Sequence, residues 1–467
     1  MSVLLDPTRT RTDDLAPVQT IAHHVPPLLP VVGADLVSPL VDGSALRYAN
    51  LDQAASTPAL RAVSDHLAEV LPYYSSVHRG AGFASQVSTH LYEAARHTVA
   101  GFVGARPDDV VVFTRNTTDA LNLLATAVPT GPGAGDVIFL ESEHHANLLP
   151  WQDLPHRCVP VSHTLAGTVE RLAEALRERP TALVAVTGSS NVTGEILPIA
   201  RIAALAHAHG ARIAVDAAQL APHRRIDLAA LDLDYLAFSG HKIYAPFGAG
   251  VLVGRRDWLD AAPAYLAGGG AVSEVGTDHT EWAAAPQRHE AGTPNVLGAA
   301  AVAAACRTIA ALPAGALEAH EGELRERLVR GLRQVPGVRL LQIWPDSTER
   351  IGVVAFVVVG HDSGRVAAYL SAEHGIGVRD GRFCAHPLLA RLGYGDGALR
   401  ASLGAGSSSE DVDRLVAAIE LLVTDGESWD YERVQGRWAP SPDPRPTTPW
   451  LAGEPLTAGE GASPCGD

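Results

Sequence analysis

The stretch Leu233-Asp-Tyr-Leu-Ala-Phe-Ser-Gly-His-Lys242 joins a short apolar run to a polar turn that ends in a lysine. The run over 233–238 predicts a buried strand, because short apolar runs bounded by turn residues are typical of sheet cores. A lysine directly after such a strand, beside Ser239 and His241, can form an imine with an aldehyde cofactor. The same residues also fit a surface lysine in an ordinary turn, so other segments must decide between the two interpretations.

Apolar runs alternate with helical patterns on the amino-terminal side of this stretch. Strands are predicted at 109–114, 183–187 and 213–216, and helices at 88–103, at 199–209 and after Thr118. This alternation predicts an α/β fold with a mostly parallel sheet covered by helices on both faces. Ligands bind at the carboxyl ends of the strands in such sheets, and the turn at 239–242 falls at one of these ends.

The pattern changes after about residue 310, which predicts a second, smaller α+β domain. Its expected elements are a helix carrying Leu324, Leu328 and Leu332, a strand at 352–359, and a helix after Ser407-Ser-Ser-Glu410, which resembles a capping box. The domains are therefore expected at 46–310 and 311–430. Residues 1–45 are predicted to be an irregular extension, and the Pro-rich residues 431–467 an extended or disordered tail.

Composition excludes several functional classes. The 467 residues are 46% hydrophobic and 19% charged, as expected for a soluble globular protein, and the net charge of −16 argues against nucleic-acid or membrane partners. Four scattered cysteines predict neither a disulfide framework nor a metal site. No signal peptide is recognisable, and the apolar run 296–306 is too short to span a bilayer, so we expect a cytoplasmic protein.

Asp216 ends the predicted strand that precedes the lysine turn. Pyridoxal 5′-phosphate (PLP) enzymes need a carboxylate against the pyridinium nitrogen, so that the ring acts as an electron sink. Asp216 can supply it, and Gln219 can hydrogen-bond the phenolic oxygen. The alternative for Asp216 is a helix N-cap.

Two more segments fit the same cofactor. Asn116-Thr-Thr118 follows a strand and opens a helix, where backbone N–H groups and hydroxyls can bind a phosphate, although Thr-Thr is also an ordinary cap. In Glu143-His-His-Ala-Asn147, an imidazole can stack on the PLP ring and move protons. The His pair could instead suggest a metal, but no further ligands occur at suitable spacing, so we expect none.

Taken together, these segments resemble the class V, fold-type I PLP enzymes, and most of all the SUF-type (group II) cysteine desulfurases and selenocysteine lyases. The resemblance covers about residues 49–424 and is specific because its motifs occur in the family order. They are Asn50-Leu-Asp-Gln-Ala-Ala-Ser-Thr-Pro58, Val77-His-Arg-Gly80, Phe113-Thr-Arg-Asn-Thr-Thr118, Glu143-His-His-Ala-Asn147, Ser190-Asn191, Val215-Asp-Ala-Ala-Gln219, Phe238-Ser-Gly-His-Lys242, Glu290-Ala-Gly-Thr-Pro-Asn295, Val378-Arg-Asp-Gly-Arg-Phe-Cys384 and Arg400-Ala-Ser402.

The resemblance implies a role for each matching residue. Lys242 corresponds to the Schiff-base lysine, which also moves the Cα proton. The other matches are Asp216 and Gln219 to the ring partners, Thr117, Thr118, Ser239 and His241 to the phosphate ligands, His144 to the stacking histidine, and Asn191, His78 and Arg379 to residues around the substrate. Arg400 matches the arginine that clamps the α-carboxylate, for which a guanidinium fork is suited. Thr293 matches a threonine that reaches the neighbouring subunit's phosphate, which implies a homodimer.

Cys384 stands where desulfurases of this family carry a cysteine that attacks the substrate sulfur and becomes a persulfide. Such a thiol must be accessible and near positive charge, which Arg379, Arg382 and His386 can supply. The alternative is a small buried hydrophobe. Cys158 and Cys306 are predicted to be structural, and Cys465 has no assigned role.

Several positions depart from the family pattern around the substrate. Asp380 replaces a threonine before the cysteine motif, and its carboxylate can raise the thiol pKa by opposing the arginines. The other departures are Gly82-Phe-Ala-Ser85, Ala267 before Gly268-Gly-Gly270, and Gly406-Ser407-Ser408. They affect the substrate mouth and the dimer surface more than the cofactor site.

Three functions remain open from the sequence. The first is a cysteine desulfurase that converts L-cysteine to L-alanine and passes the sulfur from Cys384 to an acceptor protein. The second is another class V PLP enzyme, namely a C–S lyase, a selenocysteine lyase, or an aminotransferase- or epimerase-like enzyme of secondary metabolism. The third is a binding protein without catalysis, which the intact Lys242, Asp216 and Arg400 disfavour.

Overall fold

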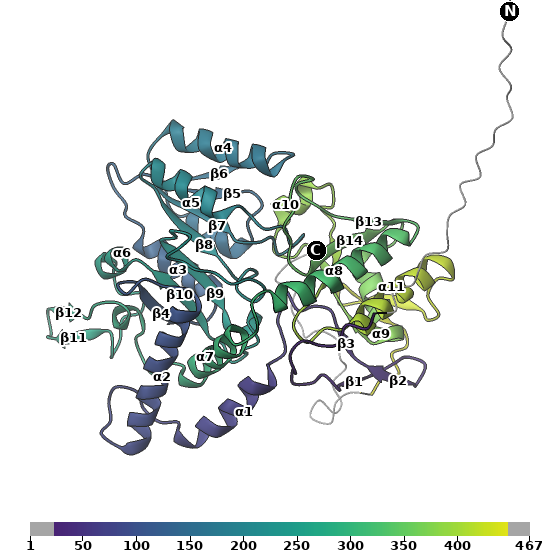
Figure 1. Ribbon diagram of the computed structural model, residues 1–467, viewed down its shortest axis with the longest axis horizontal. Coiled ribbons are helices and arrows are strands. Elements are labelled where there is room, and N and C mark those ends of the chain that lie inside the picture. The colour runs from purple at the N-terminus through teal and green to yellow at the C-terminus, as the bar shows by residue number, and fades with distance from the viewer. Residues whose placement is uncertain (1–22, 447–467) are drawn as a thin grey trace, which may run out of the picture.

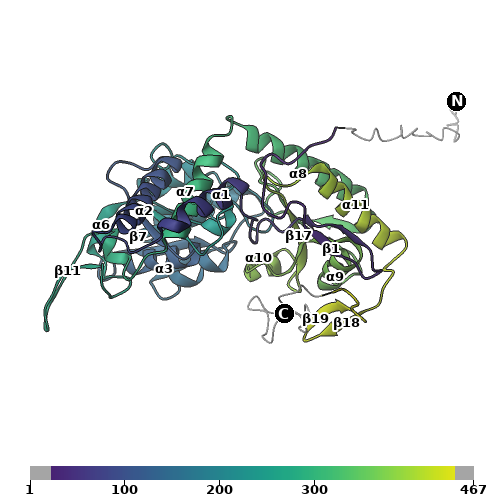
Figure 2. The ribbon, with the colours of Figure 1, turned by 90° about the horizontal axis from the view of Figure 1, so that it is seen from below.

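A computed structural model describes residues 23–446, which form two lobes joined side by side (Figures 1 and 2). The large lobe is built on a seven-stranded sheet of order β4-β10-β9-β8-β7-β5-β6. Its strands are β4 (Val110–Thr114), β5 (Asp136–Leu140), β6 (His156–Val159), β7 (Thr181–Thr187), β8 (Arg212–Asp216), β9 (Tyr235–Ser239) and β10 (Gly250–Gly254). Only β10 runs antiparallel to its neighbours, so the predicted mostly parallel sheet is confirmed.

Helices cover both faces of this sheet, as the sequence predicts. One face packs against α2 (Phe83–Phe102), α4 (Leu165–Glu178), α5 (Ile199–Ala208) and α7 (Val296–Ala310), and the other against α3 (Thr117–Ala127) and α6 (Arg256–Ala261). Strand β7 is apolar throughout because both of its faces are buried. Val184 and Val186 lie in the core on one side of the sheet, and Leu183 and Ala185 lie in the core on the other side. Burial of both faces leaves only the strand ends for polar side chains.

The small lobe contains a four-stranded antiparallel sheet of order β13-β14-β17-β16. The strands are β13 (Val338–Leu340), β14 (Val353–Val358), β16 (Arg379–Gly381) and β17 (Ala398–Ser402), and the helices of this lobe are α8 (Ala316–Gln334), α9 (Ser363–His374), α10 (His386–Arg391) and α11 (Ser409–Thr424). The predicted α/β fold with a smaller α+β domain is thereby confirmed.

The N-terminal segment is attached to the small lobe. Val25 lies in the small-lobe core, and Leu28 and Leu29 donate backbone hydrogen bonds to the carbonyl of Ala405. Within the extension predicted to be irregular, β1 (Val37–Pro39) pairs with β2 (Ala45–Arg47), and β3 (Ala49–Asn50) then joins β15 (Ile376–Gly377). Helix α1 (Arg61–Val70) leads the chain into the large lobe.

Two local predictions are wrong. The capping box of α11 begins at Ser408 with Asp411 rather than at Ser407, because the Ser407 hydroxyl accepts a hydrogen bond from the amide of Gly404. The tail expected from residue 431 instead starts with a hairpin of β18 (Tyr431–Val434) and β19 (Arg437–Pro440). Tyr431 is buried in the small-lobe core and Trp438 packs against it, which explains why the hairpin is ordered. Residues 447–467 of the predicted tail lie outside the described residues.

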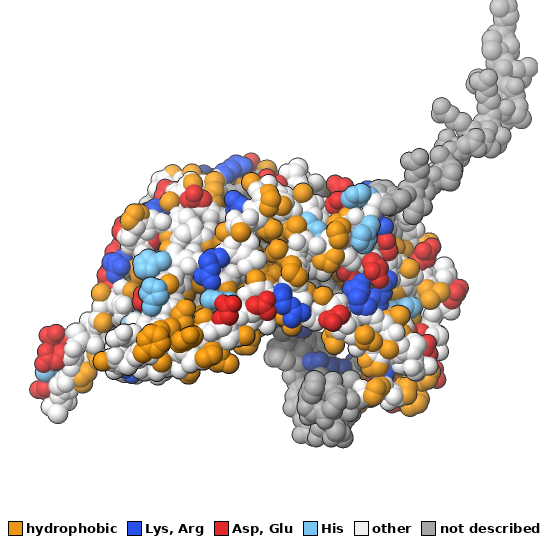
Figure 3. Space-filling view, turned by 60° about the horizontal axis from the view of Figure 1, so that its bottom comes forward, with side chains coloured by type: hydrophobic (Ala, Val, Ile, Leu, Met, Phe, Trp, Pro, Cys, Tyr) orange, Lys and Arg blue, Asp and Glu red, His pale blue; other side chains and the backbone are white. Residues whose placement is uncertain are grey.

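A further hairpin projects from the large lobe. It consists of β11 (Val272–Val275) and β12 (Thr280–Trp282), and Figure 3 shows it standing clear of the body of the protein. Its exposed side chains include the acidic Glu274, Asp278 and Glu281. The hairpin follows the glycine triplet at 268–270, one of the segments that depart from the family pattern.

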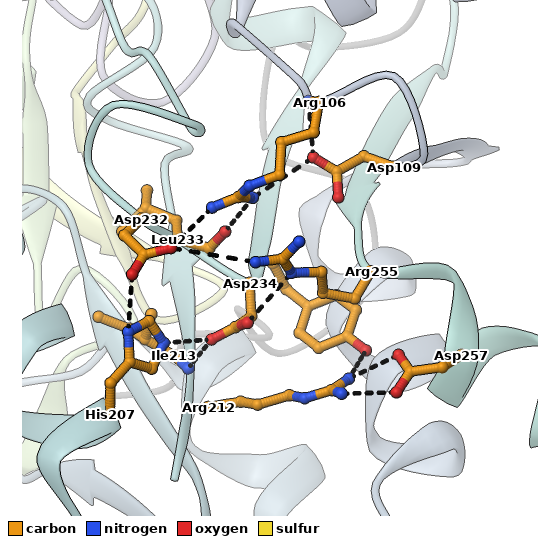
Figure 4. A network of polar contacts seen from close by, with 11 residues as sticks. Arg106, Asp109, His207, Arg212, Ile213, Asp232, Leu233, Asp234, Arg255 and Asp257 are labelled. Carbon is orange, nitrogen blue, oxygen red and sulfur yellow. Dashed lines mark hydrogen bonds and ion pairs between the residues drawn. The ribbon is translucent and has the colours of Figure 1, made fainter. Parts of the chain in front are cut away.

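Polar contacts hold the amino-terminal edge of the large sheet together (Figure 4). The buried carboxylate of Asp234 accepts hydrogen bonds from His207 Nε2 at 2.8 Å, from the amide of Ile213 at 3.0 Å and from Arg255 Nε at 3.4 Å. These contacts join β8, β9 and α5 at the edge opposite the strand ends that carry the polar turn. The network is therefore structural.

Replacing Asp234 with alanine is expected to lower the free energy of unfolding by about 2–4 kcal/mol, because a buried amide and a histidine lose their acceptor. Urea denaturation followed by circular dichroism measures the change. The matched control is Asp257→Ala, which also removes an ion pair, to Arg212, but from a side chain that is 61% exposed. This control should lower the free energy of unfolding by less than about 1 kcal/mol. Equal losses of unfolding free energy in the two variants would contradict a structural role for the Asp234 network.

Candidate active site

A pocket of about 310 Å³ opens at the carboxyl ends of the strands, where the two lobes meet. Its lining residues come from the ends of five strands of the large sheet, β4, β5, β7, β8 and β9, and from the small lobe. They include Asn116, Thr117, Thr118, His144, Asn191, Asp216, Gln219, Ser239, His241, Lys242, Arg379, Phe383, Cys384 and Arg400. The structure therefore brings together twelve of the fourteen residues singled out from the sequence.

The amino terminus of α3 forms one end of the pocket. Asn116 caps the helix by accepting a hydrogen bond from the amide of Asp119 at 2.9 Å. Ser239 Oγ accepts from the amide of Thr117 at 2.8 Å and lies 2.7 Å from its hydroxyl. A Cβ at Gly250 would lie only 2.4 Å from Asn116 Cα, so the close approach of β10 requires glycine there. The hydroxyls and helix dipole converge as an anion site requires.

Two histidines of the pocket are held neutral. Burial lowers the pKa of His144 to about 3, and its Nδ1 accepts from the amide of Ala146 at 3.0 Å, so the ring proton is assigned to Nε2. Burial, aided by the charge of Lys242, lowers the pKa of His241 to about 4. Both rings can therefore donate or stack without carrying charge at neutral pH.

Asp216 occupies the end of β8 at the base of the pocket. Its carboxylate accepts a hydrogen bond from the amide of Ala218 at 2.9 Å, and burial raises its pKa. Gln219 donates from Nε2 to the carbonyl of Ala54 at 2.8 Å, which leaves its second amide N–H for another acceptor. A cation placed beside Asp216 would be stabilised there.

Lys242 ends a short 3-10 turn (Gly240–Lys242) after β9 and is the only lysine in the 467 residues. Burial lowers the pKa of its amine to about 8, although the charge of Asp216 opposes this shift. A neutral amine is the nucleophile that imine formation needs. The absence of any other lysine is a signal in the sequence that the motif analysis missed.

We expect apoprotein to take up PLP faster as pH rises, with a half-maximal rate near pH 8. Below that pH the Lys242 amine is protonated and cannot attack, whereas an ordinary lysine would still be gaining reactivity at about pH 10. Stopped-flow absorbance across this range measures the rate. In Asp216→Asn the midpoint should move lower, because the opposing charge is gone. A wild-type midpoint near the ordinary lysine value would contradict the prediction.

Arg400 lies in β17 at the small-lobe wall and is 3% exposed. Its Nη1 donates to the carbonyl of Asn191 at 3.0 Å, and its Nη2 donates to Asp52 Oδ1 at 3.0 Å. Arg379 faces it directly across β16 and β17. Asp52 was not predicted as a site residue, although it lies inside the matched segment 50–58. The two hydrogen bonds therefore fix the orientation of the Arg400 guanidinium. Arg379 and Arg400 both line the pocket.

Cys384 is half-buried on the loop between β16 and α10. Both Phe383 and Cys384 have positive φ, 53° and 52°, a conformation that side chains rarely adopt and that often marks functional loops. The carbonyl of Phe383 accepts from Asn191 Nδ2 at 2.8 Å, and that of Cys384 from the amide of His145 at 2.9 Å. These bonds hold the thiol at the pocket, where a negative charge on it would favour the charged forms of Lys242 and Arg400.

Comparison with known proteins identifies the family. Residues 49–415 match the model of the aminotransferase class-V family. The chain belongs to the aminotransferase class V family. A cysteine desulfurase of Dickeya dadantii is 40% identical over 392 residues, which are 82% of this chain and 93% of that protein. Two solved structures cover 80% of this chain and 94% of their own: the cysteine desulfurase CsdA of Escherichia coli (TM-score 0.70, 35% identity) and an apo cysteine desulfurase of Thermococcus onnurineus NA1 (TM-score 0.74, 34% identity).

The pocket of this class V enzyme fits PLP. A buried carboxylate, Asp216, lies beside a desolvated amine, Lys242, as a pyridinium ring and its aldehyde require. The donors Thr117 and Ser239 at the N-terminus of α3 suit the phosphate. Groups of three or more His, Cys, Asp or Glu side chains that could hold a metal ion are absent from the described range 23–446.

Two predicted site residues of the class V chain lie outside the pocket. His78 has Nε2 3.0 Å from Glu93 Oε1, on the surface of the large lobe. Thr293 is exposed just before α7.

Other residues considered in the sequence also lie away from the pocket. Asp380 is exposed and lines a separate groove with Arg433 and Trp438. The cysteines Cys158 and Cys306 do not line the pocket either.

Within residues 23–446, no helix is both long and apolar enough to cross a bilayer.

Proposed function

We propose that this protein is a PLP-dependent cysteine desulfurase, which converts L-cysteine to L-alanine and retains the sulfur as a persulfide on Cys384. The observation that carries this proposal is the presence of Lys242, Arg400 and Cys384 in one pocket of about 310 Å³. The identity of 40% to a cysteine desulfurase over most of the chain supports it.

The overall reaction balances without a further reductant. L-cysteine and the Cys384 thiol give L-alanine and the Cys384 persulfide. An S–S bond forms, the C–S bond of the substrate breaks with its electron pair on the carbon side, and the thiol's hydrogen is accounted for by protonation of that carbon. Bound PLP supplies the electron sink that makes the C–S bond breakable.

Each residue around the cofactor would have its own role in holding the cofactor or in moving a proton. Asp216 would hold the ring nitrogen protonated, Gln219 would donate to the phenolic oxygen, and His144 would stack on the ring. Thr117, Thr118, Ser239 and His241 would bind the phosphate, and Asn191 would line the cofactor and the substrate. The Lys242 amine would move the proton at the substrate Cα, because its lowered pKa lets it act as a base near neutral pH.

Arg400 and Arg379 would bind the substrate carboxylate. The Asp52 ion pair keeps the Arg400 guanidinium in the pocket wall while its Nε remains buried without a hydrogen-bond partner. A carboxylate that reaches this guanidinium gains charge-assisted hydrogen bonds in a dry environment. This arrangement favours an amino acid with a short side chain, whose sulfur can reach Cys384 in the same small pocket.

The assembly and partners belong to the same proposal. Exposed Thr293 and the projecting β11–β12 hairpin are suited to contact a second copy of the chain, in which Thr293 would reach the partner's phosphate site. His78 would act near the substrate only within such a dimer.

The proposed reaction also needs an acceptor protein, to which the sulfur of the Cys384 persulfide would pass. The thiol has to stay reduced for this, which fits the cytoplasm.

Incubation of the PLP-loaded protein with L-cysteine and a thiol reductant tests the proposal. Alanine and sulfide should form in equal amounts, and without reductant the peptide containing Cys384 should gain the mass of one sulfur atom. Formation of pyruvate in place of alanine would indicate a C–S lyase. Turnover of L-selenocysteine alone would indicate a selenocysteine lyase. Either result would reject the proposed desulfurase.

A further inference from the structure

Another groove, of about 650 Å³, shares no lining residue with the active-site pocket or with the groove at Asp380. Its walls are the carboxyl-terminal half of α8, the end of β13, the start of β14 and the loop after β7 that carries Thr193. Figure 1 shows α8 and β13 side by side on the small lobe. Four arginines line the groove against one glutamate: Arg325, Arg330, Arg333, Arg350 and Glu326. This charge is opposite to the net charge of −16 of the whole chain.

Two buried polar atoms in this groove have no hydrogen-bond partner. They are Nε of Arg325 and Oγ1 of Thr193, whose residue is 1% exposed. Burial, together with the neighbouring charge of Arg350, lowers the pKa of Arg325 to about 10. Unsatisfied buried donors destabilise a fold, so their persistence calls for a ligand.

Among the four arginines of the groove, only Arg350 forms an ion pair with a carboxylate of the described residues 23–446. Glu195 accepts from the amides of Ile343 and Trp344 and pairs with Arg350 at 3.2 Å. Glu321 pairs with Arg224 at 2.8 Å and with His223 at 2.9 Å. Arg325 donates to neither of them in a hydrogen bond. Positive charge in the groove therefore exceeds what its own carboxylates neutralise.

We propose that this groove binds a small, multiply charged oxyanion of the phosphate class. Guanidinium forks match the oxygens of phosphate in geometry and charge, and the Thr193 hydroxyl adds a donor. The volume lies within the range of small-molecule sites. The site is independent of the proposed desulfurase reaction, although the loop that supplies Thr193 to it also supplies Asn191 to the active site.

Calorimetric titration of the PLP-loaded protein with sodium pyrophosphate at constant ionic strength tests the site. Using the loaded protein keeps the probe out of the cofactor's own phosphate site. We expect one bound pyrophosphate per chain. The affinity should fall at least about tenfold in Arg325→Gln/Arg333→Gln, because two charged donors are lost. The matched control is Arg201→Gln, an exposed arginine on α5, which should bind as the wild type does.

Further titrations identify the source of the anion. Tighter binding of ATP than of pyrophosphate would indicate a nucleotide, and the reverse order a free polyphosphate. Should the double variant lose its PLP band, Arg333→Gln alone replaces it, since Arg333 is exposed and its loss leaves the core intact. Unchanged pyrophosphate affinity in the variants would overturn the proposal. Binding of a polyglutamate peptide but not of pyrophosphate would overturn it too.

Discussion

Replacing Lys242 with alanine should lower the rate of alanine formation from L-cysteine by at least about a thousandfold, since both covalent cofactor attachment and proton transfer at Cα are lost. The same variant should lack the visible absorption band of PLP attached to lysine. No second lysine in the chain can replace it, because Lys242 is the only one. Absorbance and amino-acid analysis of the purified variant measure both effects.

The single lysine also provides a control for this prediction. Borohydride reduction of the wild-type protein should fix PLP on one peptide, the one that contains residue 242. Lys242→Arg keeps a positive charge but cannot be deprotonated to a nucleophile, so it should fold and still lack the band. Persistence of the band in either variant would show that PLP is attached elsewhere, for which the α-amino group is the remaining primary amine.

The sequence predicted which residues gather at one end of the pocket, because this end is built from strand termini. Each short apolar run, such as 213–216 and 233–238, marks a buried strand whose next polar residue must lie at the sheet edge. The residues after β8 and β9 therefore had to meet in space. Their burial and pKa shifts could not be predicted, since these depend on the small lobe closing over them.

Contacts between segments far apart in the chain were not predictable in the same way. The Asp52–Arg400 ion pair joins residues 348 positions apart, and no local pattern connects them. The β18–β19 hairpin was missed because the frequent prolines that begin at Pro440 led the whole segment from residue 431 to be assigned to a tail. The two strands are ordered by Tyr431 and Trp438 against the small-lobe core. His78 and Thr293 were expected at the site from family motifs, and in a single chain both face outward.

Replacing Cys384 with serine should reduce alanine formation from L-cysteine by at least about a hundredfold while leaving the PLP band intact. A serine hydroxyl fills nearly the same space but stays protonated near neutral pH, so it cannot attack the substrate sulfur as a thiolate does. The cofactor residues Lys242 and Asp216 are untouched, which predicts normal PLP content. Absorbance and alanine assays on the same preparation separate the two effects.

The matched control is Cys158→Ser, because Cys158 is exposed on β6 and does not line the pocket. Its activity should equal that of the wild type, which excludes a general effect of losing a thiol. A Cys384→Ser protein that continued to release sulfide from L-cysteine with pyruvate as the co-product would be a C–S lyase. In that case the strained loop at Phe383 and Cys384 would serve to shape the pocket, and the persulfide assignment would have to be withdrawn.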